Sequence, residues 1–328
     1  MNFNKGFSFF IESKGNIFQP EQHRLGNKNK GKIVYLIEED NENLGFFAMY
    51  RRWIEYLYFA HICGYVPVIN AGEHFAYRSV GGKKRTNNAF EYYFEQPAGI
   101  SIEEAYKSNR VIFSEVRHRQ MVELVLLGKY DCYFYNKRYL HMMSDIVRRY
   151  IKFNRTTWNY ITDGIDRLGI KRNRVLGIHV RGTDFRKKFN DHPVFVSEQD
   201  VFDKIESVIP KYGYDKIFLA TDDASILNNF ITRYRDLVCN YTDVIRSDSM
   251  QSVIFQKNNR RNNQQLLGLE VIRDMYTLSQ CEGFICGMSQ VAVCAQMNKL
   301  ARKEIYKDIE VIDHGIYKNN RNFHRYQI

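Results

Sequence analysis

Short apolar segments alternate with longer segments of helical period along the chain, and this alternation constrains the fold more than any other feature of the sequence. Residues 32–40, KIVYLIEED, carry an apolar run typical of a buried strand. Residues 44–64 place apolar side chains at helical spacing, with Gly64 as a stop, and residues 65–70, YVPVIN, predict a second strand. A strand, a helix and a strand in this order form a βαβ unit, so we expect a parallel sheet.

The second half of the chain repeats the alternation. Strands are predicted at 175–180, 216–221 and within 279–287, and helices at 198–213, 222–234 and from 289 onward. Residues 144–168 predict one long helix before this half. A length of 328 residues suits two domains or one large one. The fold is therefore predicted as α/β, with two Rossmann-like domains, residues 1–172 and 173–328, that face each other across a cleft.

Charge and cysteine content narrow the class of protein. Lys and Arg exceed Asp and Glu by 11, which suits a nucleic acid, an anionic membrane surface or a phosphate-bearing ligand as partner. The six cysteines form no C-x-x-C pair and no zinc-finger spacing, which favours reduced thiols in a cytoplasmic protein. No apolar run approaches the roughly 20 residues that span a bilayer, and the N-terminal apolar stretch is too interrupted for a signal peptide. The basic C-terminal segment 318–328 is a candidate for peripheral contact with acidic lipid.

The strand predicted at 175–180 ends in a cluster of charges, in the sequence LGIHVRGTDFRKK. Arg181 offers a planar fork of donors that can hold a phosphate bidentately, and Gly182 lets the backbone approach a ligand closely. Thr183 and Asp184 suit either a contact with Arg181 or the cap of a turn. Ligands of open α/β sheets bind beyond the carboxyl ends of the strands, so a site is expected in this loop. An exposed strand end with an ordinary salt bridge would explain the same residues.

A pair of acids ends the next predicted strand. Asp222 and Asp223 follow residues 216–221, KIFLAT. They suit a role in orienting a basic partner such as Arg181, and an aspartate before a helix is equally a good N-cap. Because the pair is not a D-x-D motif, metal coordination is not indicated.

Two further polar groups lie later in the same half. Asp274 flanks the apolar face of a predicted helix, and Ser289 with Gln290 occupies a strand-to-helix turn. Hydroxyl and backbone N–H groups at a helix start suit a phosphate, although Ser289 is as well explained as a plain N-cap. Since these groups and Arg181 all follow strands of one domain, we expect them to converge on one cleft.

These motifs resemble those of a known family. HVRGTD, the following His192-Pro193, IFLATDD, and DMYTLSQC with GMSQV occur in the order seen in the α1,6-fucosyltransferases, a family similar to the O-fucosyltransferases. The resemblance covers roughly residues 175–298. It implies a GT-B fold, inverting transfer of fucose from GDP-fucose to a glycan, a donor bound mainly by the C-terminal domain, and no metal or other cofactor.

The resemblance also implies residue roles. Arg181 matches the clamp on the β-phosphate, and His179 matches a histidine near the nucleotide. Asp274 matches a residue at the guanine edge, and Ser289 matches a phosphate contact. The predicted donor site comprises His179, Arg181, Gly182, Asp222, Asp223, Asp274, Ser289 and Gln290.

The chain departs from the α1,6 pattern at two points. Gly182 stands where those enzymes carry a second arginine, so the chain is closer here to the O-fucosylating branch. Those enzymes also carry a glutamate between the motif aspartate and the His-Pro pair, whereas this chain has no acid between Asp184 and Asp191. The two aspartates at the ends of this stretch are then the candidates to take the acceptor proton. With Arg181 at the leaving group, we expect Arg181, Asp184 and Asp191 to be the catalytic residues. Both aspartates also suit structural roles, Asp184 as the anchor of Arg181 and Asp191 as the cap of a turn.

Other functions fit parts of the sequence. The net charge and the many aromatic residues permit a nucleic-acid binder, but no RNP-like, KH or helix-turn-helix pattern supports one. The missing acid permits a nucleotide-binding module without catalysis, and the same fold suits another sugar nucleotide such as GDP-mannose. The expected partners are a nucleotide-sugar donor and a glycan or lipid-linked oligosaccharide acceptor, without nucleic acid, in the cytoplasm or at a membrane surface.

Overall fold

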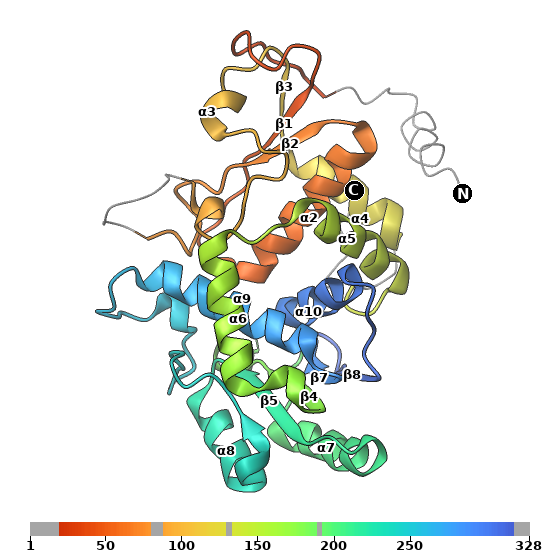
Figure 1. The fold of residues 1–328 in the computed structure, drawn as a ribbon, viewed down its shortest axis with the longest axis vertical. Helices are drawn as coiled ribbons and strands as arrows, with labels where there is room; N and C mark the ends of the chain where they lie inside the picture. The colour runs from red at the N-terminus through yellow and green to blue at the C-terminus, as the bar shows by residue number, and fades with distance from the viewer. Residues whose placement is uncertain (1–19, 80–87, 129–132, 189–191, 318–328) are drawn as a thin grey trace.

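The computed structural model describes residues 20–79, 88–128, 133–188 and 192–317, and these form two parallel sheets in separate halves of the chain (Figure 1). The first sheet has the strand order β2-β1-β3, and the second has the order β6-β5-β4-β7-β8. The strands are β1 (Val34–Ile37), β2 (Val66–Ile69), β3 (Val111–Phe113), β4 (Val175–Val180), β5 (Lys216–Thr221), β6 (Val238–Cys239), β7 (Gly283–Gly287) and β8 (Asp308–Ile312). The helices are α2 (Phe46–Cys63), α3 (Ile102–Ala105), α4 (Val116–Leu127), α5 (Lys137–Tyr150), α6 (Arg155–Leu168), α7 (Glu198–Tyr212), α8 (Ala224–Tyr234), α9 (Asn263–Gln280) and α10 (Gln290–Ala301). The predicted α/β fold class is confirmed.

The βαβ unit predicted in the first half is also confirmed. β1 and β2 pair in parallel with Val34 opposite Val66, and α2 connects them. α2 packs against α4, α5 and α10, so most of its side chains are buried. It ends at Gly64, whose φ of 69° lies in the left-handed region that glycine adopts without steric cost. A helix that is apolar on most sides therefore lies inside the molecule rather than on its surface.

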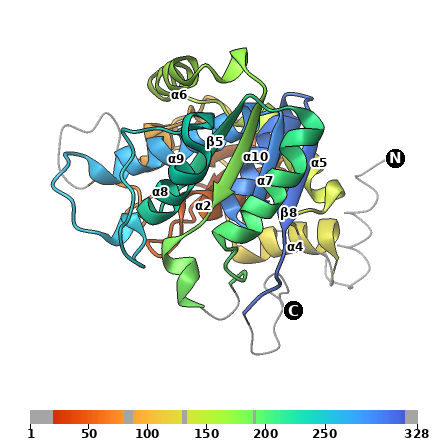
Figure 2. The same cartoon turned by 90° about the horizontal axis from the view of Figure 1, so that it is seen from below.

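β4 is the central strand of the second sheet, and all six of its residues are buried. α7 and α8 cover one face of this sheet, where Ile178 shares an apolar cluster with Phe202 and Phe230 (Figure 2). α9 and α10 cover the other face, whose apolar core continues into the N-terminal half. Burial on both faces explains why the strand is a continuous apolar run in the sequence. Because β4 ends at Val180, the residues after it emerge at the carboxyl edge of the sheet.

The single long helix predicted at 144–168 is wrong. α5 ends at Tyr150 and α6 begins at Arg155. The side chain of Asn154 accepts a hydrogen bond from the backbone N–H of Thr157 at 2.9 Å and starts a new helix as its N-cap. The two helices pack against different neighbours: α5 packs on α10, and α6 packs on α9.

The domain boundary predicted near residue 172 stays a prediction. α5 and α6 precede this boundary in the chain, but they pack against α10 and α9, which follow the boundary. Asp191 and the basic segment 318–328 lie outside the described residues. A helix with the length and apolar character needed to cross a membrane is absent from the described part of the chain.

Candidate active site

A cleft lies between the two halves and encloses about 1330 Å³, part of it open to solvent. The N-terminal half contributes the start of α2 and the aromatic pair Tyr133 and Phe134. The C-terminal half contributes the loop after β4 and the turn before α10. Arg181 lies in the wall of this cleft with 29% of its side chain exposed. An anionic ligand in the cleft can therefore reach its guanidinium.

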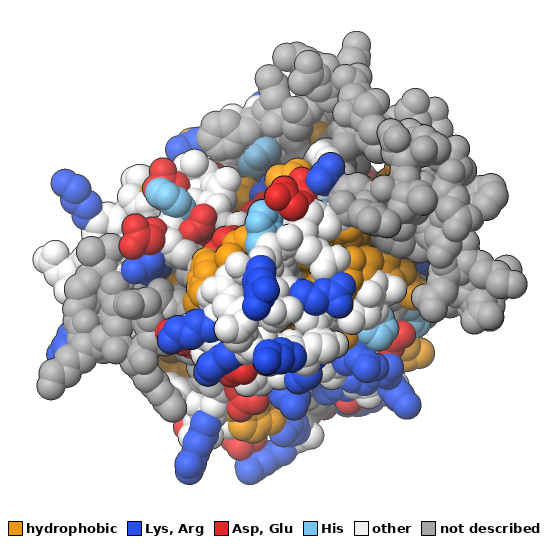
Figure 3. Space-filling view, turned by 90° about the horizontal axis from the view of Figure 1, so that it is seen from above, with side chains coloured by type: hydrophobic (Ala, Val, Ile, Leu, Met, Phe, Trp, Pro, Cys, Tyr) orange, Lys and Arg blue, Asp and Glu red, His pale blue; other side chains and the backbone are white. Residues whose placement is uncertain are grey.

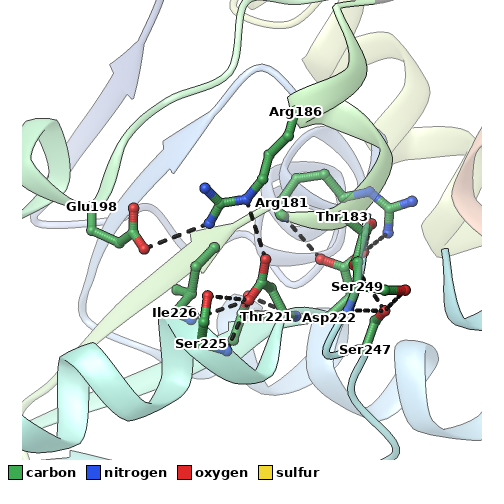
Figure 4. A network of polar contacts seen from close by, with 12 residues as sticks. Arg181, Thr183, Arg186, Glu198, Thr221, Asp222, Ser225, Ile226, Ser247 and Ser249 are labelled. Carbon is green, nitrogen blue, oxygen red and sulfur yellow. Dashed lines mark hydrogen bonds and ion pairs between the residues drawn. The ribbon is translucent and has the colours of Figure 1, made fainter. Parts of the chain in front are cut away.

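Two carboxylates, Asp184 and Asp222, hold the Arg181 guanidinium in place, and Figure 4 shows Asp222 beside it. Nη1 lies 2.6 Å from Oδ2 of Asp222, and Nη2 donates to Oδ1 of Asp184 at 2.8 Å. Burial acts to lower the pKa of Arg181, but Asp222 and Asp184 outweigh it and keep this pKa above its ordinary value. The guanidinium is thus a permanent cation whose position at the sheet edge is set before any ligand arrives.

The loop that carries Arg181 depends on a close approach between the ends of β4 and β5. Asp222 accepts hydrogen bonds from the backbone N–H of Gly182 at 2.9 Å and from Oγ1 of Thr183 at 2.7 Å. A Cβ atom on Gly182 would lie 2.4 Å from Cβ of Asp223, so only glycine fits here. Thr183 adopts a φ of 39°, in the left-handed region that costs a β-branched residue energy. Strain of this kind is found where a loop is held in a functional conformation.

The acidic pair divides its contacts between this loop and α8. Asp222 faces Arg181, whereas Oδ1 of Asp223 accepts from the backbone N–H groups of Ser225 and Ile226 as the N-cap of α8. Oδ2 of Asp223 lies 3.3 Å from Nε of Arg186. Burial would raise the pKa of Asp223, but its hydrogen bonds and Arg186 hold this pKa below its usual value. The two neighbouring carboxylates therefore do not converge on one point, and no cluster of three His, Cys, Asp or Glu side chains that could hold a metal ion occurs in the described ranges.

His179 and Ser289 form a second polar contact beside the cleft. Nδ1 of His179 lies 3.1 Å from Oγ of Ser289. Burial, with the charge of Arg181, lowers the pKa of His179 to about 3, so the imidazole is neutral near pH 7. Oγ of Ser289 also accepts from the backbone N–H of Ala292 as the N-cap of α10. The cap interpretation of Ser289 therefore holds in this structure, and the same hydroxyl lines the cleft.

Asp274 lies in a second pocket, of about 660 Å³ including open space, and Arg181 also lines this pocket. Its apolar lining includes Val244, Ile245, Val253, Leu267 and Val271. Burial raises the pKa of Asp274 to about 7, while Arg246 and Arg273 act to lower it. A carboxylate in an apolar pocket, with a cation on the same wall, suits a flat ring that carries N–H donors and is linked to an anion.

A buried arginine, not predicted from the sequence, anchors the loop over this pocket. Nη1 of Arg273 on α9 donates to Oδ2 of Asp243 at 3.0 Å. Its guanidinium carbon lies 3.7 Å from the ring centre of Tyr241 and 4.3 Å from that of Tyr160. Because the pocket residues Val244 and Ile245 directly follow Asp243, this contact fixes one pocket wall relative to α9.

A buried ion-pair network, also not predicted, borders the cleft on the N-terminal side. Arg51 pairs with Glu55 and with Glu123, and its guanidinium lies 4.2 Å from the ring centre of Tyr133. Nε of Arg51 donates to Oε1 of Gln290 at 3.2 Å, so Gln290 contacts the opposite half rather than the residues around Arg181. Burial raises the pKa of Glu55 above its ordinary value, while Arg51 acts to lower it. Arg51 and Glu55 lie four positions apart in an otherwise mostly apolar helix, and this spacing is the feature of the sequence that could have predicted the ion pair.

The candidate residues thus fall into groups. Arg181, Gly182, Asp184 and Asp222 form one loop cluster, and His179 with Ser289 lies in the same cleft wall. Asp274 occupies the adjoining pocket.

Comparison with known proteins gives one family and several structures. A family model described as alpha-(1,6)-fucosyltransferase N- and catalytic domains matches residues 133–308. The chain is similar to NodZ alpha-1,6-fucosyltransferase soaked with GDP-fucose, with 16% identity, 81% of this chain and 92% of that chain covered, and a TM-score of 0.48. NodZ from Bradyrhizobium gives 15% identity, coverage of 86% and 96%, and a TM-score of 0.49. POFUT1 in complex with GDP-fucose gives 9% identity, coverage of 87% and 99%, and a TM-score of 0.45. No curated protein matches the sequence.

Proposed function

The chain belongs to the alpha-(1,6)-fucosyltransferase family, whose model covers more than half of its residues, and on this premise we propose that it transfers fucose from GDP-fucose to a glycan acceptor. We further propose that the transfer inverts the configuration at the sugar carbon and needs no metal. The observation that carries the proposal is the fixed guanidinium of Arg181 at the carboxyl end of the central strand, in the wall of the cleft.

Arg181 is proposed to stabilise the leaving group. As the bond between the sugar carbon and the diphosphate breaks, negative charge builds on the β-phosphate and positive charge on the sugar ring. A fixed cation at that position stabilises the transition state more than the ground state. Asp184 and Asp222 orient this cation, which is the role that their contacts support. Arg186 is directed instead toward Asp223 and Glu198.

Asp274 is proposed to accept hydrogen bonds from the guanine edge. Guanine presents a ring N–H and an amino group side by side, and a carboxylate can accept from both. The apolar lining of the same pocket suits the faces of the base. Since Arg181 lines this pocket too, the diphosphate of a nucleotide bound there would extend toward the guanidinium.

The affinity for GDP is expected to rise with pH because only the ionised form of Asp274 can accept from both donors. The pKa of about 7 means that the carboxylate becomes populated as the pH rises through 7. The dissociation constant should fall about tenfold from pH 6 to pH 8, since the competent fraction of Asp274 rises by that factor. Calorimetric titration of GDP checks this, with Asp274→Asn as the control that should bind weakly and lose most of the pH dependence. A wild-type affinity that falls over this range would contradict the assignment.

Release of GDP from GDP-fucose is expected to need no metal ion. Because Arg181 supplies the positive charge at the leaving group, GDP release from GDP-fucose should change by less than about twofold in excess EDTA. Loss of turnover in EDTA that only manganese restores would show that the cation is a metal ion. The chelated enzyme should be compared with enzyme to which manganese is returned.

The test of the function itself is a screen of donors. Thermal unfolding with GDP-fucose, GDP-mannose, a UDP sugar and a dTDP sugar identifies the bound nucleotide, because a ligand of the native state raises the melting temperature. Release of GDP from GDP-fucose then separates an enzyme from a binding module. A larger shift with UDP or dTDP sugars than with GDP-fucose would assign another donor.

A phosphate-bearing small molecule is preferred over nucleic acid as the anionic partner. On the face in Figure 3, Lys and Arg side chains are most frequent in the lower half of the view, where acidic and uncharged side chains interrupt them. The proposed acceptor, a glycan that is free or lipid-linked, and the proposed cytoplasmic or membrane-peripheral location rest on the sequence alone.

A further inference from the structure

Transfer of a sugar to a hydroxyl group releases a proton, so the reaction calls for a group in the cleft that can accept it. The acidic candidates after Arg181 are Asp184 and Asp191, and Asp191 lies outside the described residues. Asp184 lines the cleft but already accepts a hydrogen bond from Arg181 at 2.8 Å, and its Oδ1 lies 2.9 Å from Oγ1 of Thr183. Its contacts support positioning of the cation rather than proton transfer.

Among the described residues, the other titratable side chains of the cleft wall are poor bases near neutral pH, and the exception is His192. Burial raises the pKa of Tyr77 and of Tyr133, and the arginines remain charged. His179 has a pKa of about 3 because it is buried beside Arg181. His192 also lines the cleft and is partly exposed. A neutral imidazole carries a ring nitrogen with a free lone pair, and such a nitrogen is the commonest proton acceptor in general base catalysis.

The backbone of His192 is fixed by pairing with a distant segment. Its carbonyl accepts from the N–H of Tyr317 at 2.9 Å, and the N–H of Val194 donates to the carbonyl of Gly315 at 2.9 Å. These bonds flank an antiparallel bridge between Pro193 and Ile316. The imidazole is therefore carried on an anchored stretch of chain rather than on a free loop.

The side chain of His192 and the proposed phosphate clamp share one aromatic neighbour. The ring of His192 lies 5.9 Å from the ring centre of Phe185, edge to face, and the guanidinium carbon of Arg181 lies 5.8 Å from the same centre. Phe185 also lines the cleft. An inverting transfer needs the leaving group and the attacking hydroxyl on opposite sides of the sugar carbon, with a base close to the hydroxyl. His192 and Arg181 therefore both lie within 6 Å of one ring centre in the wall of the same cleft, which brings the proposed base and the proposed phosphate clamp to the same region.

We propose that His192, the residue before Pro193, is the general base of the transfer. This proposal rests on the proposed function. An oxygen lone pair of the acceptor forms the new bond to the sugar carbon, and the bond from that carbon to the β-phosphate oxygen breaks. The bonding electron pair leaves with GDP, beside Arg181. The acceptor proton passes to a ring nitrogen of His192, and the imidazolium then releases it to solvent. The products are the fucosylated acceptor, GDP and one proton.

Other charged groups share this cleft and enter the expected pH dependence. Arg181 and Asp184 lie on the same wall, and Arg51 and Arg52 line the opposite half. Asp274 titrates near pH 7 but acts on donor binding, so its effect disappears once donor is saturating. The rate at saturating donor should therefore rise with pH as the general base loses its proton, and level off once the base is unprotonated.

The test uses the full chain, GDP-fucose and water as the acceptor, because water attack also releases a proton. GDP release is measured in single turnovers at saturating donor for the wild type, His192→Gln and His314→Gln. His314 pairs with Asp200 at 3.2 Å and does not line the cleft, so it is the matched control. We expect His192→Gln to slow GDP release about 100-fold and to lose the pH-dependent limb, with GDP affinity unchanged. His314→Gln should behave as the wild type.

Chemical rescue distinguishes catalysis from a structural role. In His192→Gly, added imidazole should restore GDP release in proportion to its concentration, and it should do nothing for Arg181→Ala. A His192→Gln rate near that of the wild type, or a slow His192→Gly enzyme that imidazole does not rescue, overturns the proposal. A wild type that neither binds GDP nor consumes GDP-fucose overturns the proposed function instead, so the two failures are separate.

Discussion

Arg181→Ala is expected to slow GDP release from GDP-fucose by on the order of 10³-fold, because the variant lacks the fixed cation beside the leaving diphosphate. The fold should survive the change. Asp222 would still accept from the N–H of Gly182 and from Oγ1 of Thr183, so its carboxylate keeps two hydrogen-bond partners. Single-turnover GDP release measures the rate, and circular dichroism with thermal unfolding checks the fold.

Two control variants sharpen this experiment. Arg181→Lys keeps the charge but loses the planar fork, so it should fall between Arg181→Ala and the wild type. Arg233→Ala removes an arginine of α8 that pairs with Glu206 on the surface, and it should leave turnover unchanged. Near-normal turnover in Arg181→Ala would remove the main support for the proposed function. A collapse of the folded state in that variant would instead assign Arg181 a structural role.

The meeting of Arg181 with Asp222 was predictable from the sequence because both follow apolar strands. Parallel strands end at the same edge of a sheet, so charges placed after neighbouring strands converge there. β4 and β5 are neighbours, with Val180 opposite Thr221. The pattern of apolar runs followed by polar residues thus indicated the sheet edge at which the loop cluster lies.

Contacts that depend on tertiary packing were not predictable in the same way. Arg51 and Gln290 lie 239 positions apart and meet only because α2 and α10 pack together. Arg273 needs Asp243 and two tyrosines from other elements, and no local pattern marks them. The break between α5 and α6 contains no proline or glycine, so the helical periodicity continued through it in the sequence. Here the N-cap of Asn154, supported by packing on α9, outweighs local propensity.

Gly182→Ala is expected to be the most damaging small substitution in the loop cluster. The new methyl group would lie 2.4 Å from Cβ of Asp223, an atom fixed by the backbone rather than the movable end of a side chain. The ends of β4 and β5 must then separate, at a cost of about 1–3 kcal/mol in the free energy of unfolding. Because Arg181 is the preceding residue, its guanidinium moves with the loop, and a displacement near 1 Å costs about 100-fold in rate. Urea unfolding and GDP release from GDP-fucose measure the two effects.

A double variant tests whether the close approach is the cause. Asp223→Gly removes the atoms that the new methyl group would meet, and glycine is itself an acceptable N-cap for α8, so this change alone should cost little beyond the contact with Arg186. Gly182→Ala should therefore be less harmful in the Asp223→Gly background than in the wild type, in both stability and rate. Equal harm in both backgrounds would show that Gly182 is needed for its backbone conformation and not for the space beside Asp223.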